Sequence, residues 1–318
     1  MICGDSGASM SELVLHHYPL SPYSEKIRAI FGYKQLAWKS VVTPLQLPKP
    51  DLLALTGGYR KAPVLQIGRD IYCDSALMVR VIDRLYPTPP LLPSALKASC
   101  AAFAAIEQTL FFAAVPTVFQ PAGLKVLMER IGPEQMARFS ADRAQLFTGG
   151  SASRPGPEFG KTHFLPLMNA LDQQLQASPF LLGEAPTAAD FSAFHPVWFI
   201  RNNAGVAPLL DPFKSLMAWF ERMTAFGNGS PAEISADEAI ALARSSADLQ
   251  PPDGPLLEPE GARIGSQVTV AATDYGVDPV AGRLIHASVF EIVIKRVDER
   301  AGELVVHFPR AGFKVTPA

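Results

Sequence analysis

The sequence predicts three consecutive regions of different class: an α/β region, an all-helical region and a small all-β region. Three observations indicate this division. Short apolar runs alternate with amphipathic stretches up to residue 88, helical periodicity fills residues 94–247, and short β-like runs separated by turn residues fill residues 261–318. Proline-rich segments near residues 87–93 and 250–255 read as linkers. We therefore expect domains at residues 11–88, 94–247 and 261–318.

The first region alternates strand and helix. Ser21 followed by Pro22 is a typical helix start, and Asp74 is placed to cap a later helix. Gly68-Arg69-Asp70 is a predicted hairpin turn. In chain order the predicted elements are strand 13–18, a helix from residue 22, strand 37–42, a short helix at 51–55, the strand pair 63–67 and 71–73, and a helix from residue 75.

The second region is expected to be almost wholly helical. Thr187 and Asp190 form a reciprocal capping box at one helix start, and residues 234–243 are predicted to be the last helix of this block. The longest apolar stretch, residues 101–119, carries Glu107 and contains Pro116, which favours a buried helix over a membrane span.

The third region is expected to fold as a compact barrel, SH3-like or similar, because strands this short need closure to hide their edges. Residues 251–318 hold nine acidic and seven basic residues, which argues against a nucleic-acid-binding barrel.

Composition excludes several classes of protein. The chain has 318 residues, 48% apolar and 18% charged, so a large core is available and disorder is excluded. A formal charge of −2 gives no field for nucleic acid or an anionic membrane. Cys3, Cys73 and Cys100 are far apart, which indicates buried free thiols in a reducing cytoplasm. The first twenty residues do not read as a secretory signal; Met10 is a candidate natural start, with residues 1–9 as a leader.

The tetrapeptide Ser21-Pro22-Tyr23-Ser24 carries the chemistry. It has the form of a Cys-Pro-Tyr-Cys redox loop in which hydroxyls replace both sulfurs. Without sulfur it cannot exchange electrons, so a dithiol reductase is disfavoured. A hydroxyl at a helix start can instead donate a hydrogen bond to the thiolate of a bound cofactor.

Four motifs in order make the first 247 residues resemble the cytosolic glutathione S-transferase family. They are Ser21-Pro22-Tyr23-Ser24, Lys61-Ala62-Pro63-Val64-Leu65, Asp74-Ser75, and Phe180-Leu181-Leu182-Gly183 with Thr187-Ala188-Ala189-Asp190-Phe191. The resemblance implies a thioredoxin-like domain, an all-helical domain, glutathione as cofactor, a homodimer, a cytoplasmic location and a role in detoxification. The β-rich tail is not part of the common family pattern.

The resemblance also implies roles for individual residues. Ser21 matches the catalytic serine of the serine-type classes, and Asp74 with Ser75 matches the pair that holds the γ-glutamyl end of glutathione. Ala62, before a presumed cis Pro63, matches the residue whose backbone pairs with the cysteinyl part. Lys61 would reach the glycyl carboxylate. The segment Thr56-Gly57-Gly58-Tyr59-Arg60 departs from the family's usual Asn-Pro, which puts the glycyl contacts in doubt.

Energetics support a serine-type mechanism. The thiol of glutathione titrates near about 8.5, so little thiolate exists at neutral pH. A hydrogen bond to a charged group contributes about 1.5–3 kcal/mol and a helix amino end about 0.3–1 kcal/mol. Together they lower the thiol pKa enough to make thiolate the major form without a general base. Whether Ser21 or Ser24 is the main donor stays open.

Several readings compete with this one. Ser21 can be only a helix cap, and Phe111-Phe112 is better explained by core packing than by a substrate pocket. His16 and His17 point to opposite faces of a strand, so no metal site is expected. The leading hypothesis is a glutathione transferase acting on a small apolar electrophile, with isomerase or dehalogenase variants possible. The alternative is a non-catalytic interaction protein of the same fold that uses the β-rich tail for partner contact.

Overall fold

A computed structural model describes residues 12–246 and 255–318 of the chain. Cys3, the candidate start at Met10, the leader and most of the predicted linker at 250–255 lie outside the described residues. The N-terminal α/β elements are β1 (Leu13–His17), α1 (Pro22–Tyr33), β2 (Ala37–Val42), α2 (Pro50–Thr56), β3 (Val64–Ile67), β4 (Asp70–Cys73) and α3 (Ser75–Leu85). This is the predicted order of strands and helices.

The helical block follows α3. Its elements are η1 (Ser94–Leu96), α4 (Lys97–Val118), α5 (Pro121–Ile131), α6 (Pro133–Leu146), α7 (Pro157–Gln174), α8 (Ala188–Arg201), η2 (Ala207–Leu210) and α9 (Lys214–Thr224). The predicted capping box between Thr187 and Asp190 is present at the start of α8. By length and composition, residues 94–118 form one helix that could cross a membrane; here it packs against α7 and α8 and carries the buried carboxylate of Glu107.

The chain then returns to the first region. Strand β5 (Ser230–Glu233) pairs in parallel with β2, and helix α10 (Ala236–Ser245) follows it. Ala239 of α10 packs against Val14 and Val41. We expected this helix to end the helical block; the expectation is wrong, because its small apolar face is buried on the sheet instead.

The C-terminal strands are β6 (Gln267–Ala272), β7 (Val280–Ala287), β8 (Glu291–Asp298), β9 (Gly302–Pro309) and β10 (Phe313–Pro317). The predicted β-rich region is therefore confirmed, but it is not an independent closed barrel. Strand β9 pairs in parallel with β4, which gives one ten-stranded sheet in the order β10-β6-β7-β8-β9-β4-β3-β1-β2-β5. Because β4 pairs with the edge of β9, β9 does not need a barrel of its own to hide that edge.

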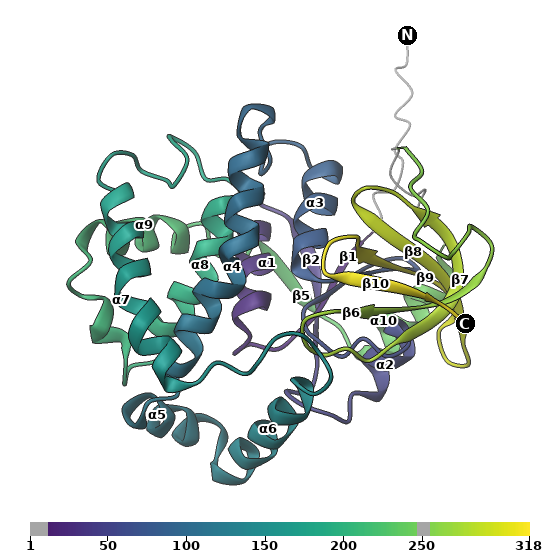
Figure 1. Cartoon of the computed structure of the whole chain (residues 1–318), viewed down its shortest axis with the longest axis horizontal. Helices are drawn as coiled ribbons and strands as arrows, with labels where there is room; N and C mark the ends of the chain where they lie inside the picture. Colours follow the sequence, from purple (N-terminus) through teal and green to yellow (C-terminus); the bar gives the residue numbers. More distant parts are fainter. Residues whose placement is uncertain (1–11, 247–254) are drawn as a thin grey trace.

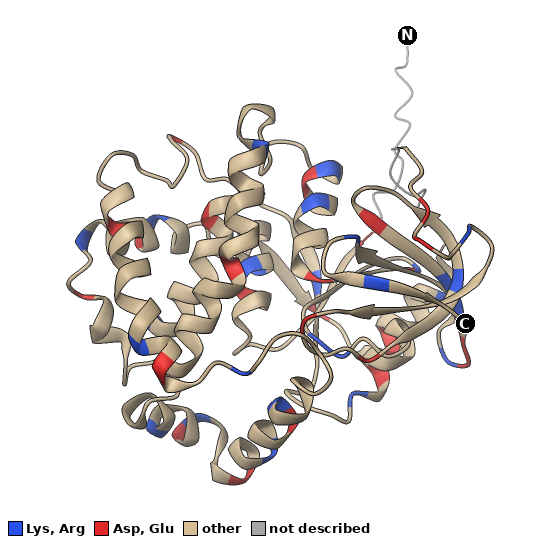
Figure 2. Cartoon of the chain, viewed as in Figure 1, with Lys and Arg blue, Asp and Glu red and all other residues tan. Residues whose placement is uncertain are grey.

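Two cores lie on opposite sides of the N-terminal strands (Figure 1). One core joins α1, α3 and the helical block. The other joins α2, α10 and the curved C-terminal strands, so these strands share their interior with the first region. Acidic and basic residues are interspersed over both halves of the molecule (Figure 2). Cys73 and Cys100 are buried free thiols, as expected.

Residues 56–60, which depart from the usual pattern of the resembled family, lie where the C-terminal strands pack against the first region. Gly57 ends α2 with φ of 78°, and a Cβ there would lie 2.5 Å from Nε of Arg296 on β8. Arg296 donates a 2.6 Å hydrogen bond to the carbonyl of Ala54, which satisfies an orphan carbonyl of α2. A Cβ at Gly58 would lie 3.0 Å from the carbonyl oxygen of Pro279. The two glycines thus give the added strands room to approach.

Candidate functional site

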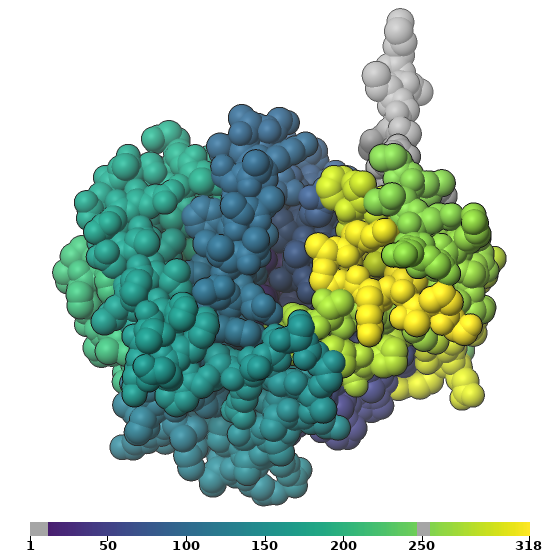
Figure 3. Space-filling model, viewed as in Figure 1, coloured from purple at the N-terminus to yellow at the C-terminus, as the bar shows by residue number. Residues whose placement is uncertain are grey.

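A cavity of about 300 Å³ lies where the first region, the helical block and the C-terminal strands meet. In Figure 3 a hollow opens at the centre of the molecule between α4 and the yellow-green C-terminal region, with purple N-terminal atoms at its floor. All six residues that the sequence singled out line this cavity: Ser21, Lys61, Ala62, Pro63, Asp74 and Ser75. They come from three separate places in the chain, and the sheet brings them together.

Ser21 is the N-cap of α1 and is 2% exposed. Its Oγ accepts a 3.1 Å hydrogen bond from the backbone N–H of Ser24. That bond occupies an acceptor site of the hydroxyl and leaves its proton free to be donated. Ser24 is fully buried and does not line the cavity. The geometry therefore favours Ser21 over Ser24 as the hydrogen-bond donor to a ligand.

Asp74 and Ser75 stand at the junction of β4 and α3, as predicted. Asp74 has φ of 75°, an uncommon conformation for a residue with a side chain, and its carboxylate accepts from the N–H of Ala76 at 2.9 Å. Such conformations occur often at ligand-binding sites. The Ala62–Pro63 peptide bond is cis, as expected. A carboxylate, a hydroxyl and the segment with the cis peptide bond thus line one cavity.

Lys61 lines the cavity but already has a partner. Its Nζ lies 3.5 Å from Oδ1 of Asp274 and donates a 3.1 Å hydrogen bond to the carbonyl of Tyr275. Both partners belong to the turn between β6 and β7, which the sequence did not connect with this site. The ammonium that was expected to meet a glycyl carboxylate is therefore held by a carboxylate of the protein itself.

Lys49, the residue before α2, is a cavity-lining cation that sequence reasoning missed. It is 1% exposed, and its Nζ donates to the carbonyl of Arg60 at 3.3 Å. No carboxylate of the described residues lies within 4.0 Å of it; Asp142 is instead paired with Arg60 and Arg143. Burial, followed by repulsion from Arg143 and Arg60, lowers the pKa of Lys49 to about 8, although Asp142 opposes this. A buried cation without a carboxylate partner marks a place for an anionic ligand group.

The outer part of the cavity is apolar. Phe111 and Phe112 both line it, so the expectation that they serve only core packing is wrong. They lie on α4 and face the cavity from the helical block. Further apolar side chains complete this wall: Val115, Phe119, Leu127, Ile131, Met136, Phe139, Leu146, Phe147 and Phe199.

Comparison with known proteins agrees with this geometry. Residues 15–90 match the family described as glutathione S-transferase, N-terminal domain, and residues 134–222 match glutathione S-transferase, C-terminal domain. The chain is also similar to the crystal structure of a GST-like protein from Pseudomonas syringae, with 38% identity over 97% of this chain and 100% of that one, and a TM-score of 0.80. The chain belongs to the glutathione S-transferase family.

More distant members share only the fold. A glutathione S-transferase from Rhodospirillum rubrum F11 is 19% identical, with 67% of this chain and 88% of that one covered and a TM-score of 0.52. Glutathione S-transferase III in its apo form is 21% identical, with 76% and 100% covered and a TM-score of 0.50. No curated protein matches the chain significantly. Because 97% of this chain is covered by the Pseudomonas syringae protein, the match includes most of the C-terminal strands.

This member of the family carries a buried polar cluster at the cavity that its sequence did not reveal. Glu107 of α4 accepts hydrogen bonds from Lys26 of α1 at 2.7 Å and from Ser192 of α8 at 2.7 Å, and Nε2 of His195 lies 2.9 Å away. Although burial opposes ionisation, the charge of Lys26 and the contacts with His195 lower the pKa of Glu107 to about 2. Nζ of Lys26 also lies 3.4 Å from Oγ of Ser75, so the cluster links both domains to a cavity-lining serine.

The histidines of the first strand have structural partners. His16 hydrogen-bonds Gln66 at 2.8 Å and His17 hydrogen-bonds Ser40 at 2.9 Å. Burial lowers the pKa of each to about 4, so both are neutral at physiological pH. Across residues 12–246 and 255–318, no group of three or more His, Cys, Asp or Glu side chains is placed to hold a metal ion.

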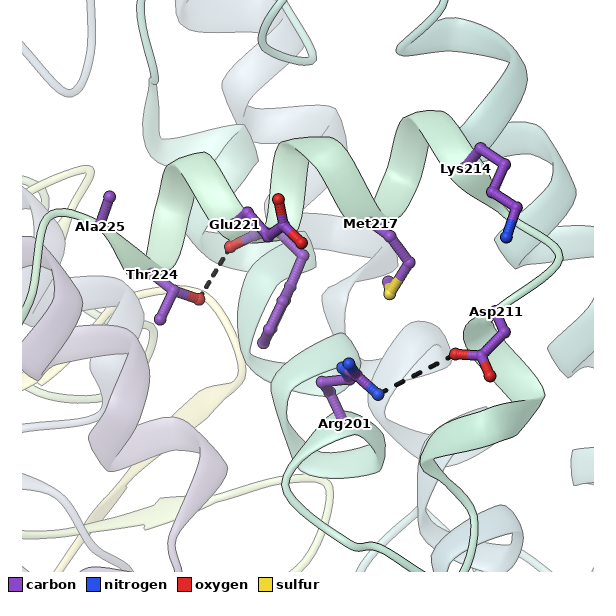
Figure 4. A pocket seen from close by; sticks show the side chains of 8 residues that line it. Arg201, Asp211, Lys214, Met217, Glu221, Thr224 and Ala225 are labelled. Atoms are coloured by element: carbon purple, nitrogen blue, oxygen red, sulfur yellow. Dashed lines mark hydrogen bonds and ion pairs between the residues drawn. The ribbon is translucent and has the colours of Figure 1, made fainter.

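A second hollow of about 580 Å³ lies on the outside of the helical block, along α9 (Figure 4). Arg201 and Asp211 face each other across it at 4.0 Å, and Lys214 and Glu221 stand at its rim. These are exposed ends of surface side chains, without a nucleophile or an unpaired buried group. The smaller cavity beside Ser21 is therefore the better candidate for chemistry, although it has less volume.

Proposed function

We propose that the protein is a glutathione transferase of the serine type. The observation that carries this proposal is the Ser21 hydroxyl, which faces the cavity from the start of α1 and is left with a proton to donate. Glutathione bound along the cavity would place its sulfur at this hydroxyl, where the helix amino end also favours negative charge. Bound glutathione supplies the nucleophilic sulfur; the protein orients it and keeps it ionised.

The rest of the peptide cofactor has matching groups. Asp74 can pair with the ammonium of the γ-glutamyl end, and Ser75, held beside Lys26, can donate to its carboxylate. The backbone of Ala62 can pair with the cysteinyl part. Because Lys61 is engaged with Asp274, we assign the glycyl carboxylate to Lys49 instead.

The second substrate would be an apolar electrophile. The aromatic and aliphatic side chains of α4, α5 and α6 form most of the wall of this cavity, which Arg143 of α6 also lines. Attack forms a carbon–sulfur bond with the electron pair of the thiolate, and the electrophile releases its leaving group or accepts charge on an electronegative atom. Isomerase and dehalogenase chemistry use the same thiolate. A homodimer and a cytoplasmic location remain predictions from the family resemblance.

Ser21→Ala tests the mechanism. The variant is expected to bind glutathione in calorimetry but to conjugate about ten- to hundredfold more slowly, because a charge-assisted hydrogen bond of about 1.5–3 kcal/mol is lost. Ultraviolet absorbance of the bound thiolate should titrate at a higher pH in the variant. Ser24→Ala is the matched control, and Ser21→Thr should restore part of the rate.

Unchanged turnover in Ser21→Ala would remove Ser21 from the mechanism. Absence of glutathione binding in the unmodified protein would favour the alternative, a non-catalytic interaction protein of the same fold. The integration of β6–β10 into the main sheet supports the catalytic proposal, since these strands do not stand free as a separate partner-binding module.

A further inference from the structure

The junction between β4 and α3, which carries Asp74 and Ser75, has an uncommon backbone conformation. Asp74 has φ of 75° and ψ of 132°, which a residue with a side chain rarely adopts. Such a conformation costs free energy and persists only where the surrounding structure enforces it. The hydrogen bonds of Asp74 within the described residues are local: its carboxylate accepts from the N–H of Ala76 and its carbonyl from the N–H of Met78. We therefore expect the elements on either side of the junction to hold it in place.

The C-terminal strands hold the junction from its β4 side. Strand β9 pairs with β4 as far as Tyr72, which lies opposite His307. The two rings are stacked, with 4.3 Å between centroids and 26° between planes. Cys73, the residue directly before Asp74, is buried in the core that α2, α10 and the C-terminal strands share. The chain thus enters the junction packed against strands from the far end of the sequence.

The same strands hold the junction from its α3 side. Phe290, in the turn between β7 and β8, packs against the guanidinium of Arg80 on α3, with 3.6 Å between Cζ and the ring centroid. This distance is well within the range of a cation–π contact. The backbone of Phe290 is itself fixed, because its N–H donates to Oγ of Ser288 at 3.2 Å and its carbonyl accepts from the N–H of Arg310 at 2.8 Å. A fixed aromatic ring therefore contacts the helix that leaves the junction.

Glu291 connects the two sets of contacts. It follows Phe290 at the start of β8 and is buried, and its Oε2 lies 3.6 Å from Nδ1 of His307. Burial lowers the pKa of Arg80, and the charge of Glu291 opposes this shift. One buried carboxylate thus interacts with the imidazole on the β4 side and with the guanidinium on the α3 side.

We propose that Phe290 is a positioning residue for Asp74. Its contact with Arg80, together with the pairing of β4 and β9, would keep the junction in the conformation that presents the Asp74 carboxylate to the cavity. Phe290 does not line the cavity, so its effect would pass through α3. This inference rests on the proposed glutathione transferase function, in which Asp74 pairs with the γ-glutamyl ammonium, and it gives the C-terminal strands a role in binding that end of the ligand.

Two ligands separate the positioning of Asp74 from a general loosening of the site. S-Methylglutathione carries the γ-glutamyl ammonium, whereas N-glutaryl-S-methylcysteinylglycine lacks only that group. In calorimetry, Phe290→Ala is expected to bind S-methylglutathione about two- to fivefold more weakly, because a cation–π contact at the surface is lost, and to bind the glutaryl analogue as the unmodified protein does. Val297→Ala, which shortens another exposed apolar side chain on β8, is the matched control and should change neither affinity.

A second background tests whether the effect acts through Asp74. In Asp74→Asn, the further change Phe290→Ala should leave the affinity for S-methylglutathione as it is, because the carboxylate that it positions is already absent. Equal weakening for both ligands in Phe290→Ala would overturn the positioning role. So would an unchanged affinity for S-methylglutathione in a protein that binds it.

A measurement without ligand keeps this proposal separate from the proposed function. Amide hydrogen exchange at residues 74–79 should be about two- to fivefold faster in Phe290→Ala and unchanged in Val297→Ala. If this result holds while the unmodified protein binds no glutathione, the transferase function fails and the positioning of Asp74 stands. Equal exchange in Phe290→Ala and the unmodified protein would overturn the positioning role.

Discussion

Lys49 is a buried cation whose charge is not matched by a carboxylate of the described residues. A buried ammonium loses hydration, and a carbonyl and the ring of Tyr18, 5.6 Å from Nζ, replace it only in part. The lowered pKa of about 8 expresses that cost. A ligand carboxylate beside Lys49 would offset it, which is the physical reason for placing the glycyl end of glutathione there.

The charge state of Lys49 makes a prediction about pH. Below pH 8 the ammonium is charged and can bind a carboxylate; above pH 8 it is neutral. The affinity for S-methylglutathione, measured by calorimetry, should therefore fall between pH 7 and pH 9. Lys49→Met should bind roughly ten- to hundredfold more weakly at pH 7 and show a shallower dependence on pH.

Lys125→Met, an exposed lysine on α5, is the control and should behave as the unmodified protein. Because Lys49→Met removes a buried charge and keeps an unbranched side chain, the variant is expected to fold. Parallel pH profiles for Lys49→Met and the unmodified protein would show that Lys49 does not bind the ligand.

At the scale of elements, the β6–β7 turn depends on contacts outside its own sheet. Its acidic residue, Asp274, faces Lys61 and Gln108, and a second acid, Asp278, lies 3.2 Å from Nε of Arg60. Arg60 and Lys61 therefore hold a turn of the same chain, and the Lys61 ammonium is already paired. A local element that lines a binding cavity is thereby kept in one position.

Asp274→Asn should loosen this turn. The Lys61 ion pair is partly exposed, so its loss should speed amide hydrogen exchange at residues 273–279 by about two- to fivefold, with strands β7 and β8 unchanged. Mass spectrometry of peptides from this segment measures the effect. Glu303→Gln, which removes an exposed ion pair with Lys295 elsewhere on the sheet, is the control. Equal exchange in Asp274→Asn and the unmodified protein would show that other contacts fix the turn.

At the scale of the whole molecule, the seam between β4 and β9 joins the C-terminal strands to the first region. His307 of β9 lies in this seam, with Nε2 2.8 Å from Asp70 of β4 and Nδ1 3.6 Å from Glu291 of β8. The ring of Tyr72 stacks on it at 4.3 Å. Burial would lower the pKa of His307, but the hydrogen bond with Asp70 and the charges of Asp70 and Glu291 outweigh burial and raise it.

The sign of this shift predicts how stability depends on pH. Because the folded protein binds the His307 proton more tightly than the unfolded chain, the contribution is complete below about pH 6.5 and is lost as pH rises through the folded pKa. Urea unfolding between pH 6 and pH 9 should show a free energy of unfolding that falls with pH relative to His307→Gln. The difference isolates His307 from Lys49, whose lowered pKa has the opposite effect above pH 8. A constant difference between the two proteins would contradict the charged seam.

The sequence by itself determined the local elements and the site residues that belong to local motifs, such as Ser21 and Asp74. The helix starts at Ser21, Asp74 and Thr187 depend on hydrogen bonds between residues that are close in the sequence. They could therefore be predicted from the sequence, and so could the strands between them. The cis peptide before Pro63 belongs to a local motif of the same kind.

Only the tertiary structure decided what lies beside these elements. Residues 305–307 of β9 pair with residues 70–72 of β4, and the burial pattern of a strand does not identify a partner so distant in the chain. The nearly continuous apolar run at residues 304–308 was the available signal, because a strand covered on both faces reads this way. The cation at Lys49, the carboxylate of Glu107 and the ring of Tyr275 became site residues because packing, which acts between distant segments, turned them toward one cavity.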